Sequence, residues 1–305
     1  MAGLRSLARG VTVALCIAVA LIHAAGAKDP ASKIPKPEPR KSCRPSLGLI
    51  LQKPISPAQL PVERPPAWPA CGLRCAAESS LAHQNNGGMA MRLVHRPIPK
   101  VNSSMLTWWF NGFDGTPGIE GDMAHPANGR TYPRYLVWHP TDHLEQFTAT
   151  PGPTPGNATG AVWGIVEFFG TRGARGHVRG DAPCAWAGDF YTNTRLRVQR
   201  VDANGLAMAF EVAGGRKAMQ LEHRWHDSPE GLRLTSVMQV GFTPDGALAA
   251  AANAVVKRAF GGRHPERAGR IWIEHAATEF SNLQYFLPRL YEQEAAAHAR
   301  MAASK

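Results

Sequence analysis

His275 and Glu279 stand four residues apart in the segment Glu-His-Ala-Ala-Thr-Glu that starts at Glu274. In a helix this spacing places both side chains on one face, with their Cβ atoms about 6 Å apart. An imidazole nitrogen and a carboxylate oxygen so placed can bind one metal ion. An ordinary polar helix face has the same spacing, so the meaning of this pair depends on ligands from other segments.

Two other segments supply such groups. Residues 138–143 read Trp-His-Pro-Thr-Asp-His and contain His139 and His143. Glu167 is the single charge in the apolar run Val-Trp-Gly-Ile-Val-Glu-Phe-Phe, and a buried carboxylate is costly unless it is paired or bound to a metal. Taken singly, each histidine is more typical of a hydrogen-bonded loop or core residue, and Glu167 also fits an outward strand position or an ion pair. With the helical pair, they indicate a metal site.

The elements that must position these groups are mostly strands. Strands are predicted over residues 134–138, 144–150, 161–169, 185–192, 195–202, 206–212, 217–226 and 232–242. Helices are predicted over residues 103–110, 246–259 and 274–299, with a further helical stretch around 75–83. Pro288 should kink the last helix. Short connections between strands indicate antiparallel hairpins. The pattern predicts an α+β fold in which a curved antiparallel sheet grips a long C-terminal helix.

Three segments, starting at Ser104, Arg134 and His275, carry a family resemblance. They read Ser-Met-x-x-Trp-Trp-Phe, Arg-Tyr-x-x-Trp-His-Pro-x-Asp-His and His-x-x-x-Glu-x-x-x-Leu-x-x-Phe-Leu-Pro. In this order, across residues 100–292, they resemble the diacetylphloroglucinol/phloretin hydrolase family. The resemblance implies a helix-grip fold of the Bet v 1/START-like kind. It also implies a zinc-dependent hydrolase that cleaves a carbon–carbon bond of an acylated phenol, with the zinc held by two histidines and two glutamates.

Carried over by position, the implied zinc ligands are His139, Glu167, His275 and Glu279. His139 is preferred to His143 because it directly follows the tryptophan of the Trp-His-Pro element. A zinc ion would lower the pKa of bound water toward neutrality and polarise an aryl ketone oxygen.

Further residues are assigned to the reaction of such a hydrolase. A proton donor must complete carbon–carbon cleavage, and His223 is preferred to His226 for this role, with a surface strand histidine as the alternative for both. Asp142 is the second candidate catalytic residue, and it can also bind a substrate hydroxyl. The candidate substrate-binding residues are Tyr135, Trp108, Trp109 and His226. Core packing explains the two tryptophans equally well.

Residues 1–27 have the parts of a secretory signal. Arg5 and Arg9 form a basic start, residues 11–22 form an apolar run too short for a comfortable membrane span, and a small-residue cleavage site ends at Ala27. We therefore expect a periplasmic or secreted protein without stable membrane insertion after cleavage. An uncleaved N-terminal anchor is the alternative.

The rest of the chain divides into a Pro-rich arm and lead-in over residues 28–100 and a hydrolase-like domain over residues 101–300. Four cysteines remain after cleavage, and in an exported protein they suggest two disulfides with three possible connectivities. These cysteines are Cys43, Cys71, Cys75 and Cys184. A metal role for the pair at 71 and 75 is the less favoured alternative.

The net charge is +11, from 34 basic and 23 acidic residues. The basic residues are scattered without a nucleic-acid motif, so we expect no nucleic-acid partner. The expected partner is a small phenolic substrate. Two other functions remain open on sequence grounds. The chain can be an exported, non-catalytic helix-grip protein that binds aromatic or lipid ligands, or an envelope protein whose basic arm contacts anionic lipid.

Overall fold

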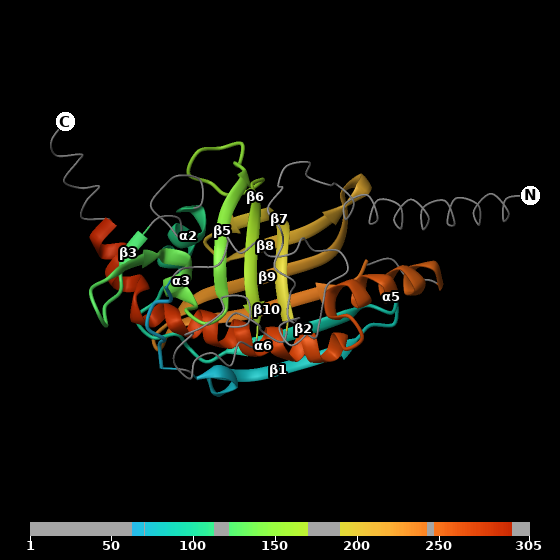
Figure 1. Ribbon diagram of the computed structural model, residues 1–305, viewed down its shortest axis with the longest axis horizontal. Coiled ribbons are helices and arrows are strands. Elements are labelled where there is room, and N and C mark those ends of the chain that lie inside the picture. The colour runs from blue at the N-terminus through green and yellow to red at the C-terminus, as the bar shows by residue number, and fades with distance from the viewer. Residues whose placement is uncertain (1–62, 70, 113–121, 170–189, 243–246, 295–305) are drawn as a thin grey trace, which may run out of the picture.

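Figure 1 shows the fold of the protein in a computed structural model. It describes residues 63–69, 71–112, 122–169, 190–242 and 247–294. The predicted signal peptide, Cys43 and Cys184 lie outside these ranges. Within them, no helix is both long enough and apolar enough to cross a membrane.

One antiparallel sheet of eight strands forms the body of the molecule, in the order β1-β2-β10-β9-β8-β7-β6-β5. Its strands are β1 (Ala76–His83), β2 (Met89–His95), β5 (His143–Thr150), β6 (Val162–Phe169), β7 (Phe190–Asp202), β8 (Gly205–Val212), β9 (Arg216–Ser228) and β10 (Gly231–Val240). A separate hairpin pairs β3 (Asp122–Ala124) with β4 (Thr131–Pro133).

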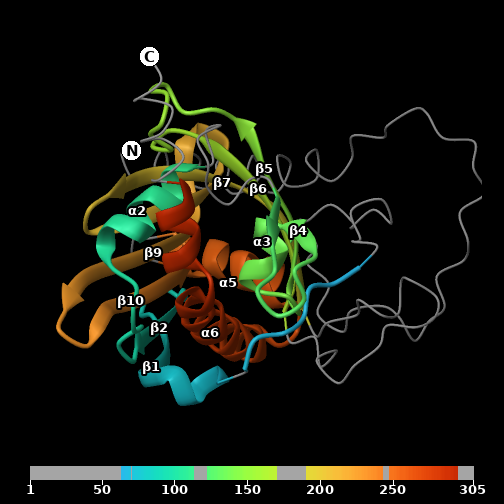
Figure 2. The same ribbon diagram turned by 90° about the vertical axis from the view of Figure 1, so that its left-hand side faces the viewer.

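Helix α6 (Pro265–Asn282) lies in the concave face of this sheet, which curves around it when viewed along the helix (Figure 2). The other helices are α2 (Ser103–Asn111), α3 (Arg134–Trp138), α5 (Ala247–Gly261) and the short 3-10 turns η3 (Gly72–Cys75), η6 (Ala213–Gly215) and η7 (Leu283–Tyr285). Residues 287–294 are again helical. The arrangement confirms the predicted α+β helix-grip fold.

Helix α6 is held in the sheet by its apolar face. Trp272, Ile273, Ala276 and Phe280 recur at helical spacing and are buried. Gly269 allows the closest approach to the sheet, because a Cβ atom there would lie 2.7 Å from Leu81 of β1. Residues of α6 belong to both buried core clusters, so packing fixes the direction in which its side chains project.

The last helix differs from the prediction at both ends. It begins at Pro265 rather than Glu274, so His275 and Glu279 lie in its second half. It is interrupted at η7, before Pro288 rather than at it. A proline has no N–H and its ring crowds the carbonyl four residues earlier, so the regular helix ends in the preceding turn.

Two predicted elements have the wrong type. Residues 76–83 form strand β1 rather than a helix, because they pair along β2 from Ala76 opposite His95 to His83 opposite Met89. Residues 134–138 form helix α3 rather than a strand. All five α3 side chains are buried, so tertiary packing overrides the strand preference of its tyrosine, valine and tryptophan. Strand β7 is continuous across residues 193–194, where a break between two strands was predicted.

Candidate metal centre

Four side chains from β5, β6 and α6 converge, three of them buried and Glu279 partly buried. His143 begins β5 and is paired directly opposite Glu167 of β6. His275 and Glu279 project from adjacent turns of α6. His143 Nε2 lies 3.4 Å from Glu167 and 3.7 Å from Glu279, and His275 Nε2 lies 4.0 Å and 3.7 Å from the same two carboxylates. Each imidazole therefore faces both carboxylates.

The hydrogen bonds behind the two imidazoles decide what they present to the carboxylates. His143 Nδ1 lies 2.9 Å from the carbonyl oxygen of Tyr135, and His275 Nδ1 lies 3.0 Å from Asp142 Oδ2. Since both partners are acceptors, each Nδ1 donates its hydrogen. A neutral ring then has only a lone pair at Nε2, which repels the carboxylate oxygens that it faces unless a proton on that nitrogen or a bound cation lies between them.

This arrangement fits a zinc-type ion. Nitrogen and oxygen donors about 2.1 Å from a tetrahedral zinc lie about 3.4 Å from one another, close to the separations found here. His143 Nε2 is also a buried atom without a hydrogen-bond partner among the described residues. Histidine ligands of metals usually donate their other N–H to a carboxylate or a carbonyl, as both of these rings do.

The pKa shifts at this site also favour a positive charge between the carboxylates. Burial raises the pKa of Glu279 to about 8, although the nearby His275 opposes this shift. Burial also raises the pKa of Glu167. Burial lowers the pKa of His275, but its hydrogen bond to Asp142 and the charges of the two glutamates outweigh that effect and raise it to about 9. Positive charge at this point therefore stabilises the buried carboxylates.

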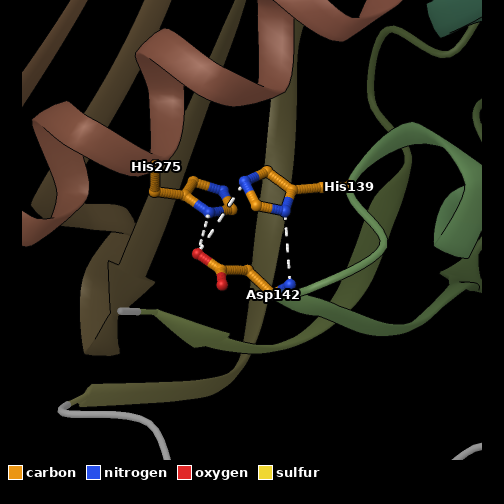
Figure 3. Close-up of side chains that lie close together, drawn as sticks. All are labelled: His139, Asp142 and His275. Atoms are coloured by element: carbon orange, nitrogen blue, oxygen red, sulfur yellow. Dashed lines mark hydrogen bonds and ion pairs between the residues drawn. The ribbon is translucent and has the colours of Figure 1, made fainter. Parts of the chain in front are cut away.

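His139 lies beside His275, and Asp142 contacts both residues (Figure 3). His139 Nδ1 accepts a hydrogen bond from the backbone N–H of Asp142 at 3.2 Å. The hydrogen of a neutral ring is therefore on Nε2, which lies 3.8 Å from Asp142 Oδ2. The ring stacks on His275 with centroids 4.7 Å apart. Two sets of side chains are close enough to hold an ion, His139–Asp142–His275 and His143–Glu167–His275.

The hydrogen bonds favour the second set. In a neutral His139 ring the hydrogen is on Nε2, and a nitrogen that carries hydrogen cannot bind a metal. The sequence pattern favours His139 over His143 as a ligand, whereas these hydrogen bonds favour His143, and both rings lie in groups that could hold an ion. The backbone N–H of His143 bonds to the carbonyl oxygen of His139 at 3.1 Å, which closes one helical turn and brings His143 to the start of β5. Adjacency to Trp138 in the sequence does not decide which ring reaches the carboxylates.

The predicted residues Tyr135 and Asp142 support the site. The Tyr135 hydroxyl donates a hydrogen bond to Glu167 Oε1 and lines the cavity described below. Asp142 is buried behind His275, whose Nδ1–H it accepts, so it orients that ring. Asp142 is not itself part of the described cavity lining, although His275, which it contacts, is.

The remaining predicted residues divide into those that line the cavity and those that do not. His223 of β9 is buried and lines the cavity. His226 is exposed, because it follows the buried Trp225 and points to the opposite face of the strand. Trp109 is fully buried in the core and Trp108 packs against its edge, which is the alternative that the sequence left open. The described cavity lining includes neither tryptophan.

A cavity of about 90 Å³ opens between the candidate metal centre and the sheet. It reaches Glu167, His275 and Glu279 at one end. Its other described lining residues are mostly aromatic or aliphatic: Phe110, Trp138, Trp163, Ile165, Phe169, Leu196, Leu206, Met208, Met219, Leu221, Met238, Phe260 and Trp272. An apolar cavity of about 150 Å³ holds benzene, so a phenolic ring requires side chains here to move. The three methionines are suited to such movement.

Gln146 is a lining residue that the sequence did not single out. Both its amide nitrogen and its amide oxygen are buried without a hydrogen-bond partner among the described residues. Such a group costs free energy unless something in the cavity bonds to it. The available signal was a lone amide in strand β5, but its direction depends on the irregular register between β5 and β6.

Residues 63–69, hereafter the strap, run along the outside of the site and form the blue segment beside α3 in Figure 2. Arg64 donates hydrogen bonds to the carbonyl oxygens of Pro140 and Thr141. Trp68 Nε1 donates to the carbonyl oxygen of Val137 at 2.7 Å. Burial lowers the pKa of Arg64 to about 9, with Asp142 opposing the shift. The strap thus fastens the backbone between α3 and β5, which carries His143.

A disulfide joins Cys71 and Cys75 at the end of the strap. The Cys71 sulfur lies 3.0 Å from Ser281 Oγ of α6. This bond confirms a disulfide role for the pair in place of a metal role. A second disulfide between Cys43 and Cys184 stays a prediction.

Comparison with known proteins assigns the chain to a class. The profile of the DAPG hydrolase PhiG domain matches residues 77–292, and the chain belongs to this family. The match confirms the family resemblance in the sequence. It begins in strand β1, after the strap, and ends after α6.

Two solved structures are also similar. The crystal structure of Ara h 8.0201 has 8% sequence identity and a TM-score of 0.27, with 61% of this chain and 96% of that chain covered. The crystal structure of protein Ms6760 from Mycobacterium smegmatis has 12% identity and a TM-score of 0.28, with 65% and 97% covered. No curated protein matches the chain. At these TM-scores, the description of the fold rests on the strand order and on the enclosed helix.

Proposed function

We propose that this chain is a zinc-dependent hydrolase that cleaves the carbon–carbon bond between the ring and the acyl group of a phenolic ketone. The observation that carries the proposal is the meeting of two imidazole Nε2 atoms with two carboxylates, one buried and one partly buried, at the end of a mostly apolar cavity. Membership of the DAPG hydrolase family supports the same reaction class.

His143, Glu167, His275 and Glu279 are the residues that would hold the ion. When bound there, zinc supplies a Lewis acid for a ketone oxygen and lowers the pKa of a water molecule. Tyr135 holds Glu167 in place through its hydroxyl, and Asp142 fixes the ring of His275. Both contacts restrict the ligands to one geometry before substrate arrives.

The cavity supports a phenolic substrate class. Its aromatic and methionine side chains can pack against a ring. The amide of Gln146, which has no hydrogen-bond partner among the described residues, offers donors and an acceptor to ring hydroxyls. His223 is the polar group on the β9 side of the cavity. We assign it to the part of the substrate where negative charge collects during cleavage.

The proposed reaction adds one water molecule across the bond. The hydroxyl group of the water joins the acyl carbon, and the bond from that carbon to the ring breaks with its electron pair left on the ring. Ortho hydroxyl groups spread this charge, and the remaining proton of the water ends on the ring carbon. The products are a carboxylic acid and a phenol without the acyl group.

Metal analysis combined with product analysis tests this function. Protein purified without chelators should contain about one zinc per chain, and it should convert phloretin or diacetylphloroglucinol into the corresponding acid and phenol. Absence of stoichiometric metal from folded protein, or intact ketone after incubation with zinc-loaded protein, would contradict the proposal. On the basis of residues 1–27 we also propose that the reaction takes place in the periplasm or outside the cell. Fractionation of cells that express the full chain tests this location.

A ligand-binding function is the second candidate, and the enclosed apolar cavity favours it. A carrier would retain an aromatic compound through gel filtration and release it unchanged, and His275→Ala would affect retention only through stability. Turnover that depends on His275 would exclude this candidate.

A further inference from the structure

Three buried side chains on adjacent strands form a hydrogen-bonded row that ends at the cavity. Ser236 of β10 is paired opposite His223 of β9. Its Oγ lies 2.8 Å from His223 Nδ1 and 2.9 Å from Nε2 of His95, on β2. Phe280 of α6 packs against both rings, with centroids 4.6 Å from His223 and 5.3 Å from His95. Of the three polar residues, only His223 is part of the described cavity lining.

Both histidines of this row are neutral at physiological pH. Burial lowers the pKa of His223 to about 3. Burial, and then the neighbouring His223, lowers the pKa of His95 to about 3. Each ring therefore has one N–H and one lone pair, and Ser236 contributes one hydroxyl hydrogen. These three hydrogens can be placed along the row in only a few arrangements.

In the first arrangement His95 donates from Nε2 to Ser236, and Ser236 donates to His223 Nδ1. The hydrogen of His223 is then on Nε2, the nitrogen left for the cavity. The unpartnered atom is His95 Nδ1, which has only a lone pair. This atom is buried and has no hydrogen-bond partner among the described residues.

The other arrangements leave a buried hydrogen without a partner. If the row runs the other way, His95 Nδ1 carries the hydrogen and has nowhere to donate it. If both rings donate to Ser236, the serine hydroxyl needs a further acceptor, and the described residues supply none. Buried N–H groups without partners are rarer than incompletely bonded acceptors, so the first arrangement is favoured.

We propose that His95 is a positioning residue which, through Ser236, keeps the hydrogen of His223 on Nε2 and so directs an N–H donor into the cavity. The role of this N–H donor in catalysis rests on the proposed function. A neutral imidazole can hydrogen-bond to the ring oxygen on which charge collects, whereas transfer of its hydrogen would leave an anionic ring. His223 is then a hydrogen-bond donor rather than the proton donor expected from the sequence.

Nitrogen-15 NMR of histidine-labelled, zinc-loaded protein tests the inference, because it distinguishes the two neutral tautomers. The His223 signals are assigned from their loss in His223→Asn. The wild-type protein should show hydrogen on Nε2. In His95→Leu, Ser236 no longer receives a hydrogen bond and can accept one from His223 Nδ1, so the population should move toward Nδ1–H. His95→Gln keeps an amide donor and should restore the Nε2–H form.

Kinetics provide a second measurement. His95→Leu should lower kcat by about 10- to 100-fold with little change in KM, and His95→Gln should recover most of the loss. Thermal unfolding and zinc content show whether each variant folds. If His95→Leu does not fold, the tautomer of His223 in His95→Gln alone decides the inference.

A wild-type His223 with hydrogen on Nδ1 would overturn the inference, even in an active enzyme. An Nε2–H tautomer that depends on His95 would support it, even in a protein that hydrolyses no phenolic ketone. The tautomer is measured without substrate, so its outcome is separate from the outcome for the proposed function.

Discussion

His143 and His139 are four residues apart, yet they present opposite polarity to their neighbours. His143 donates from Nδ1 to a carbonyl oxygen, which frees Nε2 to bind a metal. His139 accepts at Nδ1 from a backbone N–H, which leaves hydrogen on Nε2. At the scale of single residues, the backbone partner of one ring nitrogen therefore distinguishes the proposed ligand His143 from its neighbour His139.

We expect His143→Ala to lower zinc affinity by more than about 100-fold, because changes to groups that merely support a ligand already cost about 10- to 100-fold. His139→Ala is the matched control, and it should retain zinc within about 10-fold. Competition with a chromophoric chelator measures both values. Loss of zinc from the His139 variant with retention in the His143 variant would assign the ligand to His139 instead.

The buried histidines His95 and His223 also predict how stability depends on pH. Their folded pKa values of about 3 lie below the ordinary value of 6.5. As pH falls below 6.5 the unfolded chain takes up protons that the folded chain does not, so the free energy of unfolding falls. The loss approaches about 1.4 kcal/mol per pH unit for each residue and ends near pH 3.

Urea unfolding at pH 7, 6 and 5 measures this slope. His95→Gln should make it shallower by up to about 1.4 kcal/mol per pH unit. His226→Gln, at an exposed histidine of β9, supplies the matched control. Equal slopes for wild type and His95→Gln would show that His95 titrates alike in the folded and unfolded chains.

At the scale of elements, the strap stabilises the segment that presents His143. Arg64→Ala removes the donors to the carbonyl oxygens of Pro140 and Thr141. We expect faster amide hydrogen exchange over residues 139–143 and faster release of zinc to a chelator, by about 10-fold. Hydrogen exchange detected by mass spectrometry checks the first effect.

Arg130→Ala is the matched control, because Arg130 contacts Glu63 of the strap. It removes an ion pair to Glu63 in which both side chains are about half exposed, and such pairs contribute little. Exchange over residues 139–143 should therefore stay close to wild type. Equal exchange in the two variants would show that the strap does not stabilise this segment.

Local patterns predict some elements and miss others for identifiable reasons. The alternation in β9 places His223 and Trp225 on one face, and that period depends only on the strand itself. Strand β1 has no such alternation, since its middle residues Glu78, Ser79 and Ser80 are exposed. Its strand conformation comes from pairing with β2, which a local pattern does not contain.

Local patterns likewise predict some residues of the site and miss others. Helical spacing predicts that His275 and Glu279 share one face, and the isolated charge identifies Glu167 as unusual. The choice between His139 and His143 depends on the turn between α3 and β5, and the exposure of Gln146 to the cavity depends on strand register. Both are tertiary properties, so the sequence alone could not give them.

At the scale of the whole molecule, metal binding should couple to stability. The proposed ligands come from β5, β6 and α6, so the unfolded chain has no preformed site. At a free zinc concentration 1,000 times the dissociation constant, the free energy of unfolding should rise by about 4 kcal/mol. Thermal unfolding with zinc or with EDTA measures the difference.

The double variant Glu167→Gln, Glu279→Gln is the control, because it removes both carboxylates while preserving side-chain size. Its midpoint should be insensitive to EDTA. A wild-type midpoint that is also insensitive would indicate that no metal contributes to the folded state.

The strap also bears on the order in which the molecule is assembled. Trp68 bonds to a residue 69 positions later, Arg64 to one 77 positions later, and Cys71 contacts one 210 positions later. Trp68 further stacks on Phe286, close to the end of α6. A chain synthesised from its N-terminus holds the strap without partners until the sheet and α6 have been made, and contacts between such distant positions form slowly. The strap therefore closes over elements that have already met, as a late step of folding rather than a template for it.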